Sequence, residues 1–129
     1  MVITMKELEI TITHIKIMAC IDSLNKKNMY RLSDGVYKIV AGIVDEETAS
    51  LMDEPTFGTL ISFNSKKVCR YLIALQRHGY IKKIYNAKKD NLYYATTQLG
   101  SDFLEKYFKK HKKPFVKKQR KIKETILKI

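Results

Sequence analysis

Apolar residues recur at helical spacing over residues 6–24. One stripe advances by four, three and four residues, and its members are Leu8, Ile12, Ile15 and Ala19. A second stripe consists of Ile10, Ile17, Ile21 and Leu24. The alternating run ITIT at residues 10–13 is instead typical of a strand. We predict a helix, and the apolar residues on two of its faces indicate burial between elements or at a subunit interface.

A second helix is predicted after a connector at residues 25–32. Ser33 or Asp34 can cap this helix, because a short side-chain oxygen accepts a hydrogen bond from a free N–H group of the first turn. Four residues form its inward face: Val36, Ile39, Val40 and Ile43.

Two short segments without helical periodicity follow. Residues 45–55, DEETASLMDEP, carry five acids and no base. They predict a solvated loop, which beside a basic groove would also repel misplaced phosphates. Residues 56–63, TFGTLISF, are apolar around Gly58 and predict either a turn of helix or a small third strand beside a hairpin.

Residues 64–79 predict a helix with one apolar and one basic side. When 100° per residue is counted from Lys66, the apolar side lies at about 180–240° and consists of Val68, Leu72 and Leu75. The opposite side, at about 0–40° with Ala74 just beyond it, consists of Lys66, Arg70 and Arg77. Asn64 or Ser65 can cap the N-terminus, whose free N–H groups suit a phosphate. Gly79 supplies the left-handed residue that ends the helix.

A β hairpin is predicted next, from two runs rich in aromatic and β-branched residues, 80–85 (YIKKIY) and 92–97 (LYYATT). The turn between them, NAKKDN, holds three turn-forming residues and two lysines. Tyr80 and Tyr94 are expected to pack across the strands. Thr97 would cap a final helix that includes residues 101–108, and Gly100 would let that helix approach the sheet closely.

Charge is concentrated in two places. Over residues 64–98, eight Lys or Arg residues face a single acid, Asp90. The formal net charge of the chain is +12, but residues 1–104 hold 14 basic and 11 acidic groups, whereas residues 105–129 hold 11 basic and 2 acidic groups. Most of the excess therefore belongs to the C-terminal segment.

The basic side of the helix and the hairpin are the candidate nucleic-acid contacts, because Lys and Arg meet phosphates while Tyr meets sugars or exposed bases. On the helix the candidate DNA-binding residues are Ser65, Lys66, Lys67, Arg70 and Arg77. On the hairpin they are Lys82, Lys83, Tyr85, Lys88, Lys89 and Tyr93.

No residue pattern indicates catalysis, a metal site or a cofactor. Cys20 and Cys69 are too few for a four-ligand zinc site, and their apolar, helical surroundings predict buried free thiols. His14, His78 and His111 have no partner at a recognised catalytic spacing. Phosphate-cradling glycine loops and calcium-loop spacing are also absent from the sequence. We expect a protein that is not an enzyme and needs no cofactor.

Residues 109–129 form a basic extension of a predicted domain at residues 1–108. Its apolar residues recur at roughly helical spacing: Phe115, Ile122, Ile126 and Ile129. The favoured interpretations are an electrostatic arm on DNA or a helix that completes a dimer; a helix on an anionic membrane and a solvated tail are the alternatives. With no run of about 20 apolar residues and no secretory signal, we expect no membrane partner. We expect an intracellular, cytoplasmic protein, nucleoid-associated in a prokaryote.

The order of helix, basic hairpin and closing helix resembles the winged-helix superfamily. The residues that carry the likeness are Leu72-x-x-Leu75-x-x-x-Gly79-Tyr80-Ile81 and Tyr94-x-x-Thr97-x-x-Gly100. A closer likeness, over about residues 10–108, is to the RecQ-C-terminal winged helix, the DNA-binding module of RecQ-type helicases. It adds Gly35-Val36-Tyr37-Lys38-Ile39-Val40-Ala41-Gly42 and Phe57-Gly58, in the same order. The resemblance implies an α+β winged helix-turn-helix of three or more helices with a β-hairpin wing, followed by a basic C-terminal helix or tail.

The likeness also implies a grip on double-stranded DNA near a fork or junction, with the hairpin as a wedge between strands. The sequence departs from that family in lacking a helicase motor, a four-cysteine zinc element and an aromatic residue at the turn, and in having Thr96 where leucine is usual. Unwinding would therefore need a helicase partner or a larger parent chain. Two alternatives stay open. One is a MarR-like homodimeric transcription regulator, paired through its N- and C-terminal helices, and the other is a winged helix that binds proteins.

Overall fold

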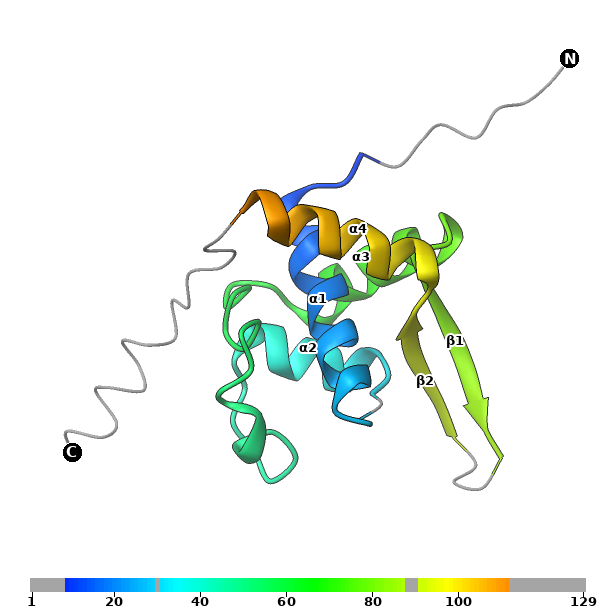
Figure 1. The fold of residues 1–129 in the computed structure, drawn as a ribbon. Coiled ribbons are helices and arrows are strands. Elements are labelled where there is room, and N and C mark those ends of the chain that lie inside the picture. The colour runs from blue at the N-terminus through cyan, green and yellow to red at the C-terminus, as the bar shows by residue number, and fades with distance from the viewer. Residues whose placement is uncertain (1–8, 30, 88–90, 112–129) are drawn as a thin grey trace, which may run out of the picture.

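The computed structural model describes residues 9–29, 31–87 and 91–111, whose arrangement is shown in Figure 1. The elements follow in the order α1 (Ile12–Lys26), α2 (Ser33–Ala41), the short 3₁₀ helix η1 (Ala49–Leu51), α3 (Ser65–Arg77), β1 (Ile81–Asn86), β2 (Asn91–Thr96) and α4 (Gln98–Lys110). β1 and β2 form a two-stranded antiparallel sheet. The described chain is thus α+β, with helices and a hairpin in the predicted order.

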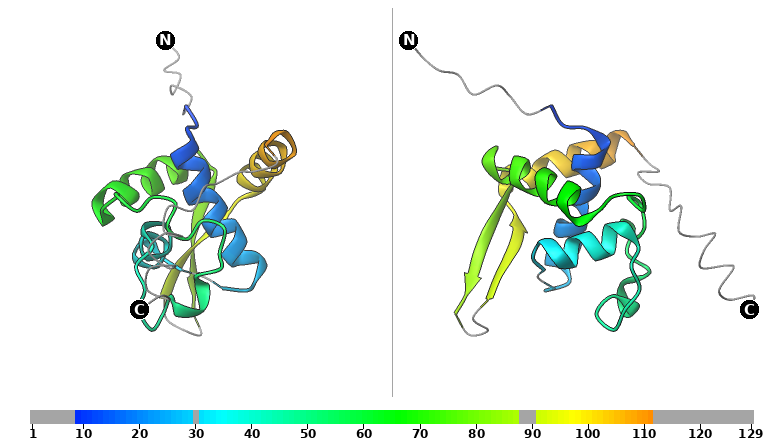
Figure 2. Two further views of the ribbon diagram at one scale, coloured as in Figure 1. Left: turned by 90° about the vertical axis from the view of Figure 1, so that its left-hand side faces the viewer. Right: turned by 180° about the vertical axis from the view of Figure 1, so that it is seen from behind.

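α1 is the central helix of the core. It contacts α2, α3, α4 and β2, and residues around its whole circumference are buried, among them Ile17, Met18, Cys20 and Ile21. The two further views in Figure 2 show α1 between α3 and α4. The prediction of a helix buried between elements is therefore confirmed.

The predicted start of this helix at residue 6 is wrong over residues 9–11, which are not helical. Thr11 is instead the N-cap, and Nδ1 of His14 accepts a hydrogen bond from the Thr11 N–H group at 3.0 Å. This reciprocal arrangement is a capping box with histidine in the place usually held by Glu or Gln.

α2 has the predicted core face but different ends. Val36, Ile39 and Val40 are buried. The predicted inward position of Ile43 is wrong, because Gly42 ends the helix in a left-handed conformation (φ 75°) and Ile43 is 37% exposed. The predicted cap is also wrong. The N-cap is Leu32, and no side chain caps the first turn.

Residues 56–63 form turns packed on the C-terminal end of α2, not a strand or a turn of helix. The N–H groups of Gly58 and Leu60 donate to the carbonyl oxygens of Ile39 at 2.9 Å and Val40 at 2.7 Å. The place beside β2 where a third strand would lie is taken by residue 31 instead of residues 56–63. The N–H group of Tyr94 donates to the carbonyl oxygen of Arg31 at 3.0 Å.

The hairpin joins α4 through a close backbone contact. Thr97 is the N-cap of α4, and its Oγ1 accepts from the N–H group of Gly100 at 3.2 Å, as predicted. A Cβ atom at Gly100 would collide with the carbonyl oxygen of Tyr80. The expected close approach of the last helix to the sheet is therefore confirmed, and only glycine fits there.

Candidate nucleic-acid interface

α3 begins and ends at local signals that its sequence carries. Oδ1 of Asn64 accepts a hydrogen bond from the N–H group of Lys67 at 2.8 Å and so caps the first turn. Gly79 has φ 80°, and the N–H group of Tyr80 donates back to the carbonyl oxygen of Leu75 at 3.0 Å. This is a Schellman-type stop, which places the basic helix directly before the hairpin.

The two sides of α3 separate as predicted. Val68, Leu72 and Leu75 are fully buried against the core. All the candidate residues on the helix have exposed side chains: Ser65, Lys66, Lys67, Arg70 and Arg77. Lys67 also places its Nζ over the ring of Phe63, 4.2 Å from the centroid. The helix therefore presents cations to solvent along its length, and their contact with DNA stays a prediction.

Ile73 and Gln76 are also exposed on α3, and the prediction from the sequence did not include them. Ile73 is 43% exposed. At 100° per residue it lies at about 340° from Lys66, between the basic residues of neighbouring turns. Gln76 is also exposed, at about 280°. Their helical angles alone could have revealed both residues. An apolar side chain and a carboxamide among cations are groups that read a thymine methyl group and an adenine edge.

The hairpin holds Lys82 and Lys83 on opposite faces, because successive strand residues alternate. Lys83 is paired with Tyr94 across the sheet, and its Nζ lies 5.6 Å from the centroid of the Tyr94 ring. Burial, and secondarily the nearby Cys69 of α3, raises the pKa of the Tyr94 hydroxyl. The face of Lys83 and Tyr94 is therefore the one toward α3. Lys82, paired with Ala95, belongs to the other face.

The candidate tyrosines are divided in the same way. Tyr85 is paired with Leu92 on the face of Lys83, near the far end of the hairpin, and these side chains are 57% and 44% exposed. Tyr93 is paired with Ile84 on the face of Lys82 and is half-buried. Because they lie on opposite faces of the hairpin, Tyr85 and Tyr93 cannot contact the same side of a bound nucleic acid in the same way. The remaining hairpin candidates, Lys88 and Lys89, lie outside the described residues.

The expected packing tyrosines are both in contact with the core. Tyr94 is buried. Tyr80 is half-buried and meets the ring of Phe103 edge-on, with centroids 5.8 Å apart. The expected packing across the strands is wrong for Tyr80, which precedes β1 and packs against α4 instead, whereas Tyr94 lies within β2 opposite Lys83.

A hollow of about 330 Å³ lies where the first turns of α2 and α3 meet, lined by Ser33, Asp34, Ser65, Lys66 and Cys69. Lys66 and the N-terminal N–H groups of the two helices give it a positive character, which the exposed carboxylate of Asp34 opposes. Cys69 is half-buried, so the expectation of a buried thiol is wrong for Cys69 and holds only for Cys20.

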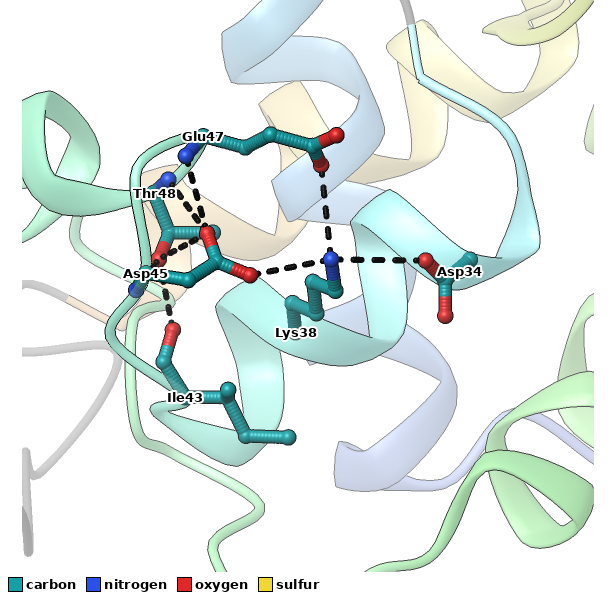
Figure 3. Close-up of polar contacts among 6 residues, drawn as sticks. All are labelled: Asp34, Lys38, Ile43, Asp45, Glu47 and Thr48. Carbon is teal, nitrogen blue, oxygen red and sulfur yellow. Dashed lines mark hydrogen bonds and ion pairs between the residues drawn. The ribbon is translucent and has the colours of Figure 1, made fainter.

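The acidic segment is attached to α2 through Lys38 (Figure 3). Its Nζ lies 2.9 Å from Oδ2 of Asp45, 3.5 Å from Oε2 of Glu47 and 3.6 Å from Oδ2 of Asp34. The hydrogen bond with Asp45, followed by the charges of the other carboxylates, raises the pKa of Lys38, and the same bond lowers the pKa of Asp45. Asp45 also accepts from the N–H groups of Glu47 and Thr48 at 2.9 and 3.1 Å, which closes the turn.

Glu54 contradicts the prediction of a fully solvated acidic loop. It is 2% exposed, and its carboxylate binds Nζ of Lys27 and Oγ of Ser23, each at 2.7 Å. A buried carboxylate is tolerated when it is paired and hydrogen-bonded in this way. The segment is therefore fixed to α1 and α2, and its suggested repulsion of misplaced phosphates stays a hypothesis.

The reactive side chains of the described core have structural roles. Burial lowers the pKa of His14, which serves the capping box and meets the ring of Tyr71 edge-on at 4.7 Å. Burial raises the pKa of the Cys20 thiol to about 12, so the thiolate is not formed at neutral pH. Within residues 9–29, 31–87 and 91–111, no group of three or more His, Cys, Asp or Glu side chains is placed to hold a metal ion.

Comparisons with known proteins add no family to this picture. No protein-family model, no curated protein and no solved structure matches the chain. Among the helices of the described residues, none is both long and apolar enough to cross a membrane.

Proposed function

We propose that this chain is a winged-helix module that binds duplex DNA, mainly through phosphate contacts from α3 and the hairpin. One observation carries the proposal. Six cations on these two elements are exposed and form no ion pair with any described residue: Lys66, Lys67, Arg70, Arg77, Lys82 and Lys83. On the rest of the described surface, four lysines pair with carboxylates, Lys26, Lys27, Lys38 and Lys109, whereas exposed Lys106 and Lys110 of α4 do not.

Clustered unpaired cations repel one another and cost stability, and a polyanion relieves that repulsion. The elements that carry them also suit a duplex. An α-helix fits the major groove, and a basic hairpin beside it meets the flanking phosphates. The backbone bond from Tyr94 to Arg31 supports the winged-helix assignment, because it places residue 31 in the third-strand position beside β2.

The test is the salt dependence of binding to a duplex, followed by fluorescence anisotropy. Engagement of about six phosphates predicts that log affinity falls against log salt concentration with a slope near −5. A 1–111 truncation, which keeps the whole of α4, separates the affinity of the domain from that of the basic extension. A slope near zero for both proteins would refute the proposal.

The RecQ-like and MarR-like versions of this function differ in partner and assembly. A RecQ-like module is a monomer that prefers forked DNA over plain duplex, whereas a MarR-like regulator is a stable dimer on a palindrome. Exposed Ile12 on α1 and Leu99 on α4 favour keeping the dimer as the second candidate, because both belong to the helices that would pair. Sedimentation at micromolar concentration, together with affinities for duplex, fork and single strand, decides between them.

A further inference from the structure

The outer edge of β2 is closed by α1 and the connector that follows it. In an antiparallel pair, alternate residues direct their N–H and C=O groups away from the partner strand. On β2 these are Tyr94 and Thr96, whose groups bind Asn25 and Arg31 instead of β1. An edge strand would otherwise leave such groups to solvent.

Asn25 takes the place of one peptide group of a third strand. Its Oδ1 accepts from the N–H group of Thr96 at 3.1 Å, while its Nδ2 donates to the carbonyl oxygen of Tyr94 at 3.4 Å. A carboxamide has the donor and acceptor of a backbone amide, so it can bridge residues i and i+2 of a strand as a neighbouring strand does. Together with the bond from Tyr94 to Arg31 at 3.0 Å, it fixes two successive outward-facing positions of β2.

Asp22, one turn earlier on α1, reinforces this attachment. Its Oδ1 accepts from the hydroxyl groups of Thr96 at 2.9 Å and Ser101 at 3.2 Å, and its Oδ2 pairs with Lys26 at 3.0 Å. The root of the hairpin and the first turn of α4 are therefore tied to the same end of α1.

The residues of β2 that Asn25 binds lie directly opposite or next to the described lysines of β1. Lys83 is paired with Tyr94, and Lys82 is paired with Ala95, which lies between the two residues bound by Asn25. A two-stranded hairpin has little rigidity of its own. A strand of six residues is about 20 Å long at 3.3 Å per residue, so a tilt of about 10° at the root moves its far end, near Tyr85, by about 3 Å. Lys82 and Lys83 are the second and third residues of β1, so the same tilt moves their backbone by only about 1 Å, and their placement depends mainly on how firmly Tyr94 and Thr96 of β2 are held.

We propose that Asn25 is a positioning residue for the basic hairpin: its carboxamide sets the angle of the hairpin to α1 and thereby places Lys82 and Lys83 relative to α3. This inference rests on the proposed DNA binding for its consequence, but the positioning itself is measurable without DNA. Asn25 touches no DNA in this scheme and acts through the backbone of β2.

The first measurement is amide hydrogen exchange of the free protein, followed by NMR, in wild type and in Asn25→Ala, Asn25→Asp and Thr48→Ala. Thr48→Ala is the matched control, because like the Asn25 variants it removes part-buried side-chain hydrogen bonds to backbone, here in the acidic segment: Oγ1 donates to the carbonyl oxygen of Ile43 at 2.6 Å and accepts from the N–H group of Asp45 at 2.9 Å. In Asn25→Ala the Thr96 amide should exchange at least about tenfold faster. In Asn25→Asp it should stay protected, since a carboxylate oxygen still accepts. Unchanged exchange of Thr96 in Asn25→Ala would overturn the proposal.

The second measurement is a double-mutant cycle on duplex affinity at 0.1 M salt, at a temperature where circular dichroism shows every variant folded. In wild type, Lys82→Gln with Lys83→Gln removes two phosphate contacts and should lower affinity about 60-fold. In the Asn25→Ala background the same pair should cost less than about tenfold, because the hairpin is already misplaced.

The outcomes separate the two claims. An equal loss in both backgrounds refutes positioning and leaves the proposed function standing. No loss in wild type refutes the hairpin's part in DNA binding, while the exchange data still decide whether Asn25 orients the hairpin.

Discussion

Neutralising the exposed face of α3 gives the sharpest test of the interface. We consider the triple variant Lys66→Gln, Arg70→Gln and Arg77→Gln, which keeps long polar side chains on a surface with no described ion pair to break. Each lost phosphate contact removes about 0.9 from the slope of log affinity against log salt. The slope should therefore change from about −5 to between about −2 and −3, and affinity at 0.1 M salt should fall about 500-fold.

The matched control removes the same charge from another face. Lys106→Gln, Lys109→Gln and Lys110→Gln neutralise three exposed lysines of α4, which lies across α1 from α3 (Figure 2). Of these, only Lys109 forms an ion pair with a described residue, 3.5 Å from exposed Glu105, and the loss of such a surface pair costs little stability. Anisotropy titrations of one duplex from 0.05 to about 0.5 M salt compare wild type with both variants, over the range where counterion release dominates affinity. Equal losses in the two variants would show that total charge, and not the face of α3, drives binding, and would refute the interface.

Three further outcomes follow from the core. Gly100→Ala should lower the free energy of unfolding in urea by about 3 kcal/mol, because the new Cβ would collide with the backbone of Tyr80. Gly79→Ala should lower it by only about 1 kcal/mol, because the space there is open and the cost is that of a φ of 80°. Similar losses in the two variants would contradict the close contact at Gly100. Burial holds the folded pKa of His14 below its unfolded value of 6.5, so its contribution to stability is complete above pH 6.5 and is lost as pH falls. His14→Gln, which suits a capping box, should flatten the decline of the urea midpoint between pH 7 and 5. In native protein at pH 8, iodoacetamide should modify Cys69 before Cys20, whose buried thiol has a pKa of about 12, as mass spectrometry would show.

α3 and the hairpin could be predicted almost to the residue, because their boundaries depend on local chemistry. The cap at Asn64, the left-handed Gly79 and the cap at Thr97 each act within a few residues of the chain. The basic side of α3 could be predicted for the same reason. It follows from 3.6 residues per turn and the position of the core residues on the opposite side.

The failed predictions include groups whose partners are distant in sequence and helix ends where a neighbouring residue, such as Gly42 before Ile43, decides the boundary. Glu54 is buried because Lys27 and Ser23 lie beside it in the fold, although its neighbours in the chain indicate a solvated loop. Ser33 could have capped α2, yet the helix begins one residue earlier than a Ser33 cap requires, with Leu32 at its N-cap. Composition and periodicity cannot predict contacts such as that of Glu54, because these contacts depend on which distant segments the fold brings together.

By itself, the sequence determined the order of helices and strands, which side of α3 enters the core, and that cations gather on two consecutive elements. These properties follow from side-chain periodicity, caps and charge, all of which act locally. Only the tertiary structure decided that Lys83 and not Lys82 lies on the face toward α3, that the acidic segment is tied to α1 and α2, and that Asn25 closes the edge of β2. Each of these depends on hydrogen bonds or burial between residues far apart in the chain, whose geometry exists only once the core around α1 has formed.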